Sequence, residues 1–124
     1  ALGADKQSLL KDIKFTGFLF ESLVTHDLRV YAQAINAQVY HYTDSSGLEV
    51  DCIVQKRNGD WAAFEIKLGI GMVEEAASNL KKLVDSLDLK KISLPKSLNI
   101  IVGTGLSHIR ADGINVISLS SIGV

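Results

Sequence analysis

The sequence predicts one α/β domain in which a central mixed sheet lies between two main helices. Three observations lead to this fold class. Two segments carry apolar residues at helical spacing, three short runs joined by turn sequences have the composition of strands, and a later continuous apolar run is typical of a buried strand. The chain has 124 residues, which suffices for one domain with its own core.

The first helix is expected from about residue 16 to residue 35. We treat residues 1–14 as a lead-in segment and residues 15–124 as the domain proper. Apolar residues that recur every three or four positions predict the helix face that packs on the core: Phe18, Val24, Leu28, Tyr31 and Ile35. Glu21 is the charged member of this stripe, so we expect it at the rim of a cleft or beside a partner.

Three strands are expected at residues 38–42, 48–55 and 61–68, and their short connections predict an antiparallel meander. Asn58-Gly59 favours a two-residue primed turn between the second and third strands. A hairpin centred on that turn places Asp51 opposite Ile66. A shift of one residue would instead place Asp51 opposite Glu65 or Lys67 and on their face of the sheet.

The remaining elements follow a glycine-rich break at residues 69–71. Apolar residues at helical spacing predict a second helix from Val73 to Leu87 or Leu89, with a charged outer face. Residues 98–102 form the continuous apolar run of a central strand. Residues 116–119 predict a last, short strand.

Composition limits the classes of function. Hydrophobic residues make up 47% of the chain, charged residues 22%, and the net charge is -1, so no strong general attraction to nucleic acid or to a membrane is expected. No apolar run is long enough for a membrane span, and no signal peptide is visible. The single cysteine, Cys52, is expected to be a buried, inert thiol, which fits a cytoplasmic protein.

Four charged residues lie within apolar segments and are candidates for a metal-binding or catalytic site: Glu21, Asp51, Glu65 and Lys67. Two strand carboxylates can hold one Mg²⁺ or, as a substitute, Mn²⁺, with several waters. A lysine beside such an ion can orient the attacking water or stabilise charge that develops on phosphorus. We therefore predict Asp51 and Glu65 as metal ligands, Lys67 as the catalytic lysine, and Glu21 as a further carboxylate acting through water.

Simpler interpretations of the same residues stay open. Glu65 and Lys67 can form an ion pair at the sheet edge, and Asp51 can pair with His41 or Lys67. The three histidines are too scattered to predict a zinc site. Trp61 is expected to pack over the sheet, although it can also stack on a base.

The order and spacing of these motifs resemble the PD-(D/E)xK, or restriction-endonuclease-like, nucleases. More closely, they resemble a prokaryotic domain of unknown function that follows an AAA-type ATPase module. The shared motifs are Gly17 to Glu21 in a helix, Tyr40-His41-Tyr42 in a strand, Glu49-Val50-Asp51, and Glu65-Ile66-Lys67. The resemblance covers residues 15–119 and implies a metal-dependent nuclease site formed by Asp51, Glu65, Lys67 and Glu21.

Two departures from the family patterns bear on function. Val50 occupies the place of the proline that precedes the first strand acid in the nuclease superfamily. The phosphate-binding Gly-x-x-x-x-Gly-Lys-Ser/Thr motif of an ATPase is absent. The chain begins without methionine, so a fragment of a longer protein is expected, and the resemblance implies that this protein is a larger ATPase of which the chain is the C-terminal part.

The expected function is a Mg²⁺-dependent nuclease-like domain that acts on phosphodiester bonds of DNA, with the ATPase domain as its partner. The first alternative is a module that kept the nuclease fold, lost its activity, and now binds or regulates the ATPase. The second is a dimerisation domain that uses the apolar C-terminal stretch Ile114 to Val124. Metal binding by the strand acids separates the first expectation from its alternatives.

Overall fold

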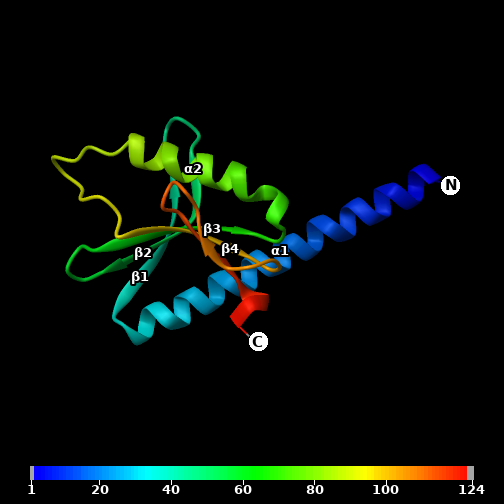
Figure 1. Cartoon of the computed structure of the whole chain (residues 1–124), viewed down its shortest axis with the longest axis horizontal. Helices are drawn as coiled ribbons and strands as arrows, with labels where there is room; N and C mark the ends of the chain where they lie inside the picture. Colours follow the sequence, from blue (N-terminus) through cyan, green and yellow to red (C-terminus); the bar gives the residue numbers. More distant parts are fainter. Residues whose placement is uncertain (1, 123–124) are drawn as a thin grey trace.

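The computed structural model describes the backbone of residues 2–122 and the side chains of residues 6–12 and 14–120. Within that part of the chain it contains two α-helices and one six-stranded mixed sheet (Figure 1). The helices are α1, Leu2–Ala34, and α2, Val73–Asp85, with short 3-10 turns at Ile70–Met72 and Leu119–Ile122. The strands are β1, Ala37–Thr43; β2, Glu49–Lys56; β3, Trp61–Lys67; β4, Ser97–Val102; β5, His108–Ile109; and β6, Asn115–Ser118. Residues 1, 123 and 124, which the predicted bounds include, lie outside the described residues.

The strand order across the sheet is β1-β2-β3-β4-β6-β5. The first three strands form the predicted antiparallel meander. β4 runs parallel to β3 and β6 runs parallel to β4, whereas β5 pairs antiparallel with β6. Parallel neighbours need a crossover connection, and α2 supplies it between β3 and β4. The predicted mixed sheet is therefore confirmed, while the two-residue β5 was too short to show a sequence pattern.

The two helices cover opposite faces of the sheet, as Figure 1 shows. The larger core lies under α2, where Leu80 and Leu83 pack against β4 and β6. The smaller core lies under α1 and includes Val24 and Cys52. Cys52 is buried as predicted, its sulfur lies 3.7 Å from the hydroxyl oxygen of Thr25, and burial raises the pKa of its thiol. None of the described helices has the length and apolar character needed to cross a membrane.

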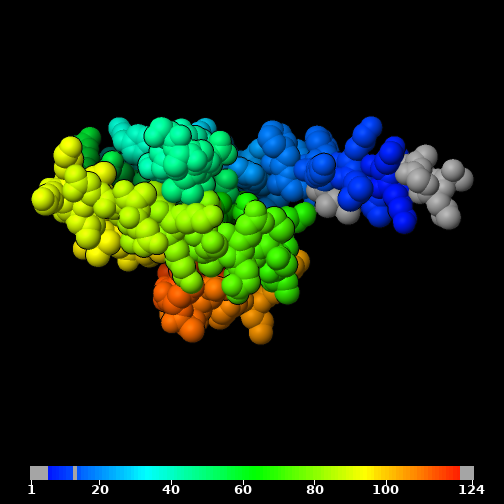
Figure 2. Space-filling model, turned by 90° about the horizontal axis from the view of Figure 1, so that it is seen from above, coloured from blue at the N-terminus to red at the C-terminus, as the bar shows by residue number. Residues whose placement is uncertain are grey.

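The first helix differs from its prediction in length and in its buried face. It begins at Leu2 rather than near Thr16, and its N-terminal part extends away from the sheet (Figures 1 and 2). Val24 is 4% exposed, whereas Phe18 is 65% and Tyr31 is 61% exposed, so assigning those two aromatic residues to the core was wrong. The helix carries apolar residues on two sides, and spacing alone does not say which side contacts the sheet.

The β2–β3 hairpin has a three-residue loop, and the predicted two-residue turn was wrong. The backbone N–H of Lys56 donates to the carbonyl of Asp60 at 2.8 Å, which leaves residues 57–59 as the loop. Gly59 has a φ of +94°, whereas Asn58 lacks the positive φ that a type I′ turn requires. The longer loop shifts the register by one residue.

This shift matters because it changes the partner of Asp51. Cys52 pairs with Phe64 and Gln55 pairs with Trp61. Continued by one residue, the register places Asp51 opposite Glu65, so the predicted pairing with Ile66 was wrong. This register corresponds to the shifted arrangement considered beside it, in which Asp51 and Glu65 are opposed.

A β-bulge in β2, like the register of the hairpin, affects the placement of Asp51. Tyr40 pairs with Ile53 and Tyr42 pairs with Val50, so that Asp51 and Cys52 together lie opposite His41. Regular alternation would place Val50 and Cys52 on the same face. Instead, Val50 packs under α2 and Cys52 packs under α1. Bulges redirect side chains in this way, and this one changes direction at Asp51.

Two apolar features serve the core. Trp61 is buried over the sheet as predicted, and its indole N–H donates to the carbonyl of Ser93 at 2.9 Å. Ile114 and Val116 are buried under α2. These two members of the C-terminal stretch are therefore used inside the domain and do not form an exposed dimerisation face.

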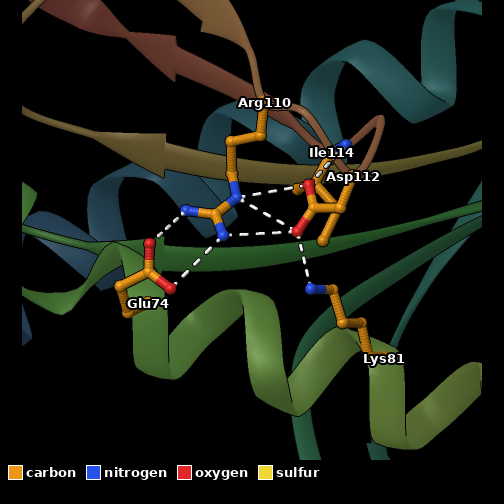
Figure 3. Close-up of polar contacts among 5 residues, drawn as sticks. All are labelled: Glu74, Lys81, Arg110, Asp112 and Ile114. Atoms are coloured by element: carbon orange, nitrogen blue, oxygen red, sulfur yellow. Dashed lines mark hydrogen bonds and ion pairs between the residues drawn. The ribbon is translucent and has the colours of Figure 1, made fainter.

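An ion-pair network joins the start of α2 to the turn before β6 (Figure 3). The guanidinium of Arg110 donates to Glu74 at 2.8 Å and to Asp112 at 3.2 Å, and the amine of Lys81 lies 2.7 Å from Asp112. The carboxylate of Asp112 also accepts the backbone N–H of Ile114 at 3.2 Å. These donors, with Lys81 and Arg110 foremost, hold the pKa of Asp112 well below its usual range. The network ties α2 to the turn before β6.

Candidate functional site

A cleft of about 260 Å³ opens between α2 and the strands β2 and β3. Three of the four predicted site residues line it: Asp51, Glu65 and Lys67. The meander contributes one further acid, Glu49. The helix contributes side chains that the sequence did not single out: Glu75, Ser78, Asn79 and Lys82. The cleft thus brings together charged groups from three elements.

Asp51 is positioned by the bulge and held by the backbone of β3. Its Oδ2 accepts the N–H of Ile66 at 2.8 Å. Nδ1 of His41 lies 3.3 Å from the backbone carbonyl oxygen of Asp51. The contact with His41 therefore involves the main chain of Asp51, and its carboxylate is oriented by β3.

Glu65 is the most buried acid of the cleft, with 2% of its surface exposed. The side-chain amide of Asn79 donates a hydrogen bond to its Oε1. Burial, followed by a hydrogen bond and charge repulsion from Asp51, raises the pKa of Glu65 to about 8, although Asn79 and Lys67 act in the opposite direction. In the absence of a cation, burial and the neighbouring Asp51 therefore favour the protonated form of Glu65.

Lys67 lies at the end of β3 on the same face as Glu65, because the two residues are separated by one position. Its positive charge lowers the pKa of both Glu65 and Glu21, although other effects outweigh it. No ion pair joins Glu65 to Lys67 among the described residues, so the alternative of a simple strand ion pair is not found. Lys67 supplies positive charge to the cleft as a whole.

Glu21 reaches Asp51 from the opposite side of the sheet. It is partly buried on α1 and lines a neighbouring hollow of about 240 Å³, not the cleft itself. Burial first, and then the charge of Asp51 and a hydrogen bond with it, raise the pKa of Glu21. The sequence predicted a rim position or a partner for this acid, and the partner is another carboxyl group. Asp51 thus lies between Glu21 and Glu65.

The donor set fits a hard divalent cation with few protein ligands. Among the described residues, no three histidine, cysteine, aspartate or glutamate side chains form a group that could hold a metal ion. Mg²⁺ commonly binds through one or two protein carboxylates and keeps several waters. Asp51 and Glu65 supply two such carboxylates. Burial, followed by the negative charge of Asp51, raises the pKa of both Glu21 and Glu65. A bound dication would relieve this repulsion.

Asn79 belongs to the candidate site, although the sequence did not point to it. Besides Glu65, its amide hydrogen-bonds the backbone carbonyl of Glu49, so it joins α2 to both β2 and β3. An available signal was its place at helical spacing between Ala76 and Leu83, where a polar side chain borders a buried stripe. Its partner could not be inferred, because nothing local relates residue 79 to residue 65.

No curated protein and no solved structure matches this chain. A family described as "Domain of unknown function (DUF4143)" matches residues 16–122, which include the C-terminal part of α1, the whole sheet and α2. This match covers most of the chain and contains all four predicted site residues. The chain therefore belongs to the DUF4143 family.

Proposed function

We propose that this domain is a Mg²⁺-dependent nuclease-like module that acts on phosphodiester bonds of DNA. It has a restriction-endonuclease-like fold in this proposal, and it forms the C-terminal part of a larger AAA-type ATPase. One observation carries the proposal: Asp51, Glu65 and Lys67 line a single cleft, and Glu21 adjoins Asp51. This is the grouping that the motifs predicted.

Each residue has a separate role in this mechanism. The carboxylates of Asp51 and Glu65 would hold the ion, which when bound supplies a Lewis acid for the phosphate and lowers the pKa of a water. Lys67 stabilises negative charge that develops on the phosphate or orients the attacking water. Glu21 accepts a hydrogen bond from a water beside Asp51.

The surrounding structure supports these roles. The Ile66 N–H and the Asn79 amide each hold one carboxylate in place, and such supporting contacts tune metal ligands. The ion-pair network at Asp112 keeps α2, and with it Asn79, over the sheet. The site is built on strands and a helix, which position side chains more accurately than loops.

Calorimetric titration of Mn²⁺ tests the metal site. Wild type should bind, and an Asp51→Asn, Glu65→Gln double variant should not. An Asp27→Asn, Asp85→Asn double variant is the matched control, because it also removes two charges but at exposed positions outside the cleft. Equal binding by all three proteins would show that the cleft acids are not the ligands.

Cleavage is tested separately with supercoiled plasmid and single-stranded DNA. Lys67→Met keeps the apolar stem and removes the charge, so it should bind Mn²⁺ but lose cutting by about 100-fold or more. Glu21→Gln should cause a smaller loss, since Glu21 lies outside the cleft. Wild type that binds Mn²⁺ but cuts no nucleic acid, even with the ATPase part present, would refute nuclease activity.

A second candidate is a module without activity that binds the ATPase part of the protein. The observation that favours it is the exposure of large apolar side chains on α1, among them Phe15, Leu19 and Leu23. Exposed apolar patches commonly mark interaction sites. A Leu19→Glu, Leu23→Glu variant should lose binding to the ATPase part under this candidate, whereas the Asp51→Asn, Glu65→Gln variant should keep it.

A further inference from the structure

Three hollows adjoin one another where α1 borders the edge strand β1. Their volumes are about 520, 310 and 240 Å³. The first and second share Gln33 and Tyr40 in their linings, and the second and third share Arg29. Glu21, the acid that interacts with Asp51, lines the third hollow, so this track along α1 and β1 ends at Glu21.

The track is positively charged although the whole chain is not. Lys56 and Arg57 line the first hollow, and no acid lines it. Arg29 lines the second and third hollows, and Glu21, at the end of the track, is the single acid in the three linings. The acids of α2 and the turn before β6, such as Glu74 and Asp112, belong to other surfaces. The near-neutral net charge therefore conceals a basic strip that leads to the carboxylates.

The remaining lining groups suit unpaired bases. The first hollow contains the side-chain amides of Gln33, Asn36, Gln38 and Gln55, which offer both donors and acceptors. The ring of Tyr40 is 44% exposed on β1, and its hydroxyl donates to Gln38. Cations that contact phosphates, combined with an exposed aromatic ring for stacking, are the usual features of single-strand binding.

The track has the length of a short oligonucleotide. The α1 residues from Glu21 to Gln33 span about 18 Å at the rise of an α-helix. With stacked bases at about 3.4 Å per nucleotide, this length accommodates about five nucleotides. The hydrogen-bonding edges of bases in a duplex are already paired, so the amides and the ring favour an unpaired strand.

We propose that the α1–β1 track, defined by Arg29, Gln33, Tyr40, Lys56 and Arg57, binds single-stranded nucleic acid and leads it to the carboxylates at Asp51. The inference extends the proposed nuclease function by naming the strandedness of its substrate. Binding itself depends on cations and a ring that lie outside the metal cleft.

Fluorescence anisotropy with fluorescein-labelled oligo(dT) in EDTA tests the track without any cleavage. The Lys56→Gln, Arg57→Gln variant should bind at least about tenfold more weakly. Its plot of log affinity against log salt should be shallower by about 1.4, which corresponds to two lost phosphate contacts on a single strand. Tyr40→Leu should weaken binding about fivefold or more and leave the salt dependence unchanged, because stacking releases no counterions.

The matched control is Lys90→Gln, Lys91→Gln, which removes two exposed cations from the loop after α2, and it should bind as wild type does. Oligo(U) in place of oligo(dT) distinguishes RNA from DNA as the preferred strand. The inference fails if wild type binds neither oligonucleotide, if the control loses as much affinity as the track variant, or if a duplex binds equally well and Tyr40→Leu has no effect.

Titrating the same variants with Mn²⁺ separates this inference from the proposed function. If the track does not bind nucleic acid, Mn²⁺ still binds to the cleft, and the track and control variants have the same affinity for oligo(dT). If Asp51 and Glu65 are not the metal ligands, oligo(dT) binding is unaffected. The Asp51→Asn, Glu65→Gln variant then binds both oligo(dT) and Mn²⁺ as wild type does. Thermal melts of each variant should match wild type, since Lys56, Arg57 and Tyr40 are exposed.

Discussion

Asn79 contributes to the site through the acid that it contacts. Its amide donates to Glu65 and to the main chain of β2, so it fixes the acid in position and favours its ionised form. Burial and the charge of Asp51 favour the protonated form of Glu65, which is a poor metal ligand, and the amide of Asn79 acts against both effects. We therefore expect Asn79 to act as a positioning residue in the proposed metal site.

Asn79→Ala should weaken Mn²⁺ binding by about 10- to 100-fold, as loss of a contact to a metal ligand usually does. Calorimetry measures the affinity, and a thermal melt reports whether the fold is kept. Ser78→Ala is the control, because Ser78 lines the same cleft on the same helix but is exposed. Equal affinities for wild type and Asn79→Ala would contradict the role given to this amide.

Glu65 should limit the stability of the metal-free protein at alkaline pH. Its pKa is raised from 4.5 to about 8, so the folded state holds one more proton than the unfolded state between these values. Stability therefore falls as pH rises through this window. In EDTA, the Tm of Glu65→Gln relative to wild type should increase by several degrees from pH 5 to pH 8.5. The exposed Glu75→Gln should show no such trend.

At the scale of elements, the sequence predicted most of the architecture because its patterns are local. The meander, α2 and the apolar β4 each follow from the spacing of apolar residues and from turn sequences within a few positions. The register of β2 and β3 and the buried face of α1 did not follow. The register depends on whether the loop has two or three residues, and the buried face depends on which of two apolar stripes contacts the sheet. The local sequence favours neither option clearly in either case, and tertiary packing decides between them.

The corrected face of α1 can be measured directly. Val24→Ala should lower the free energy of unfolding by about 2 kcal/mol, because it opens a cavity between α1 and the sheet. Phe18→Ala removes a larger but exposed side chain and should change the free energy of unfolding by at most about 0.5 kcal/mol. Urea denaturation of both variants gives the comparison. A larger effect for Phe18→Ala would instead support the buried face first predicted for this helix, which includes Phe18.

The network at Asp112 should make the attachment of α2 sensitive to acid. The pKa of Asp112 is lowered in the folded state, so its contribution to stability is present above its unfolded pKa and is lost as pH falls through the folded value. Asp112→Asn should lower the Tm at pH 7, and the difference from wild type should shrink toward pH 2 and at high salt. Asp85→Asn, an exposed acid at the end of α2, serves as the control.

At the scale of the whole molecule, we expect the acids near Asp51 to lower the stability of the metal-free fold. The bulge in β2, the register of the hairpin and the side chain of Glu21 place Asp51 between two other carboxyl groups, those of Glu21 and Glu65. The sequence identified these residues because acids within apolar runs are conspicuous. It did not reveal how they meet, since the bulge and the loop act over the sheet as a whole.

Metal should therefore reverse the order of stability among variants. In EDTA at pH 8.5, the Asp51→Asn, Glu65→Gln variant should melt above wild type, because it lacks the repulsion between the two acids. A ligand that binds only the folded state stabilises it by about 2.7 kcal/mol at about 100 times its Kd, which corresponds to about 10 °C for a domain of this size. Mn²⁺ should raise the Tm of wild type by about this amount and leave the variant unchanged, since the variant lacks both ligands. A metal-induced rise of the same size in the variant would place the bound ion elsewhere, and no rise in wild type would indicate that the carboxyl groups meet without binding a cation.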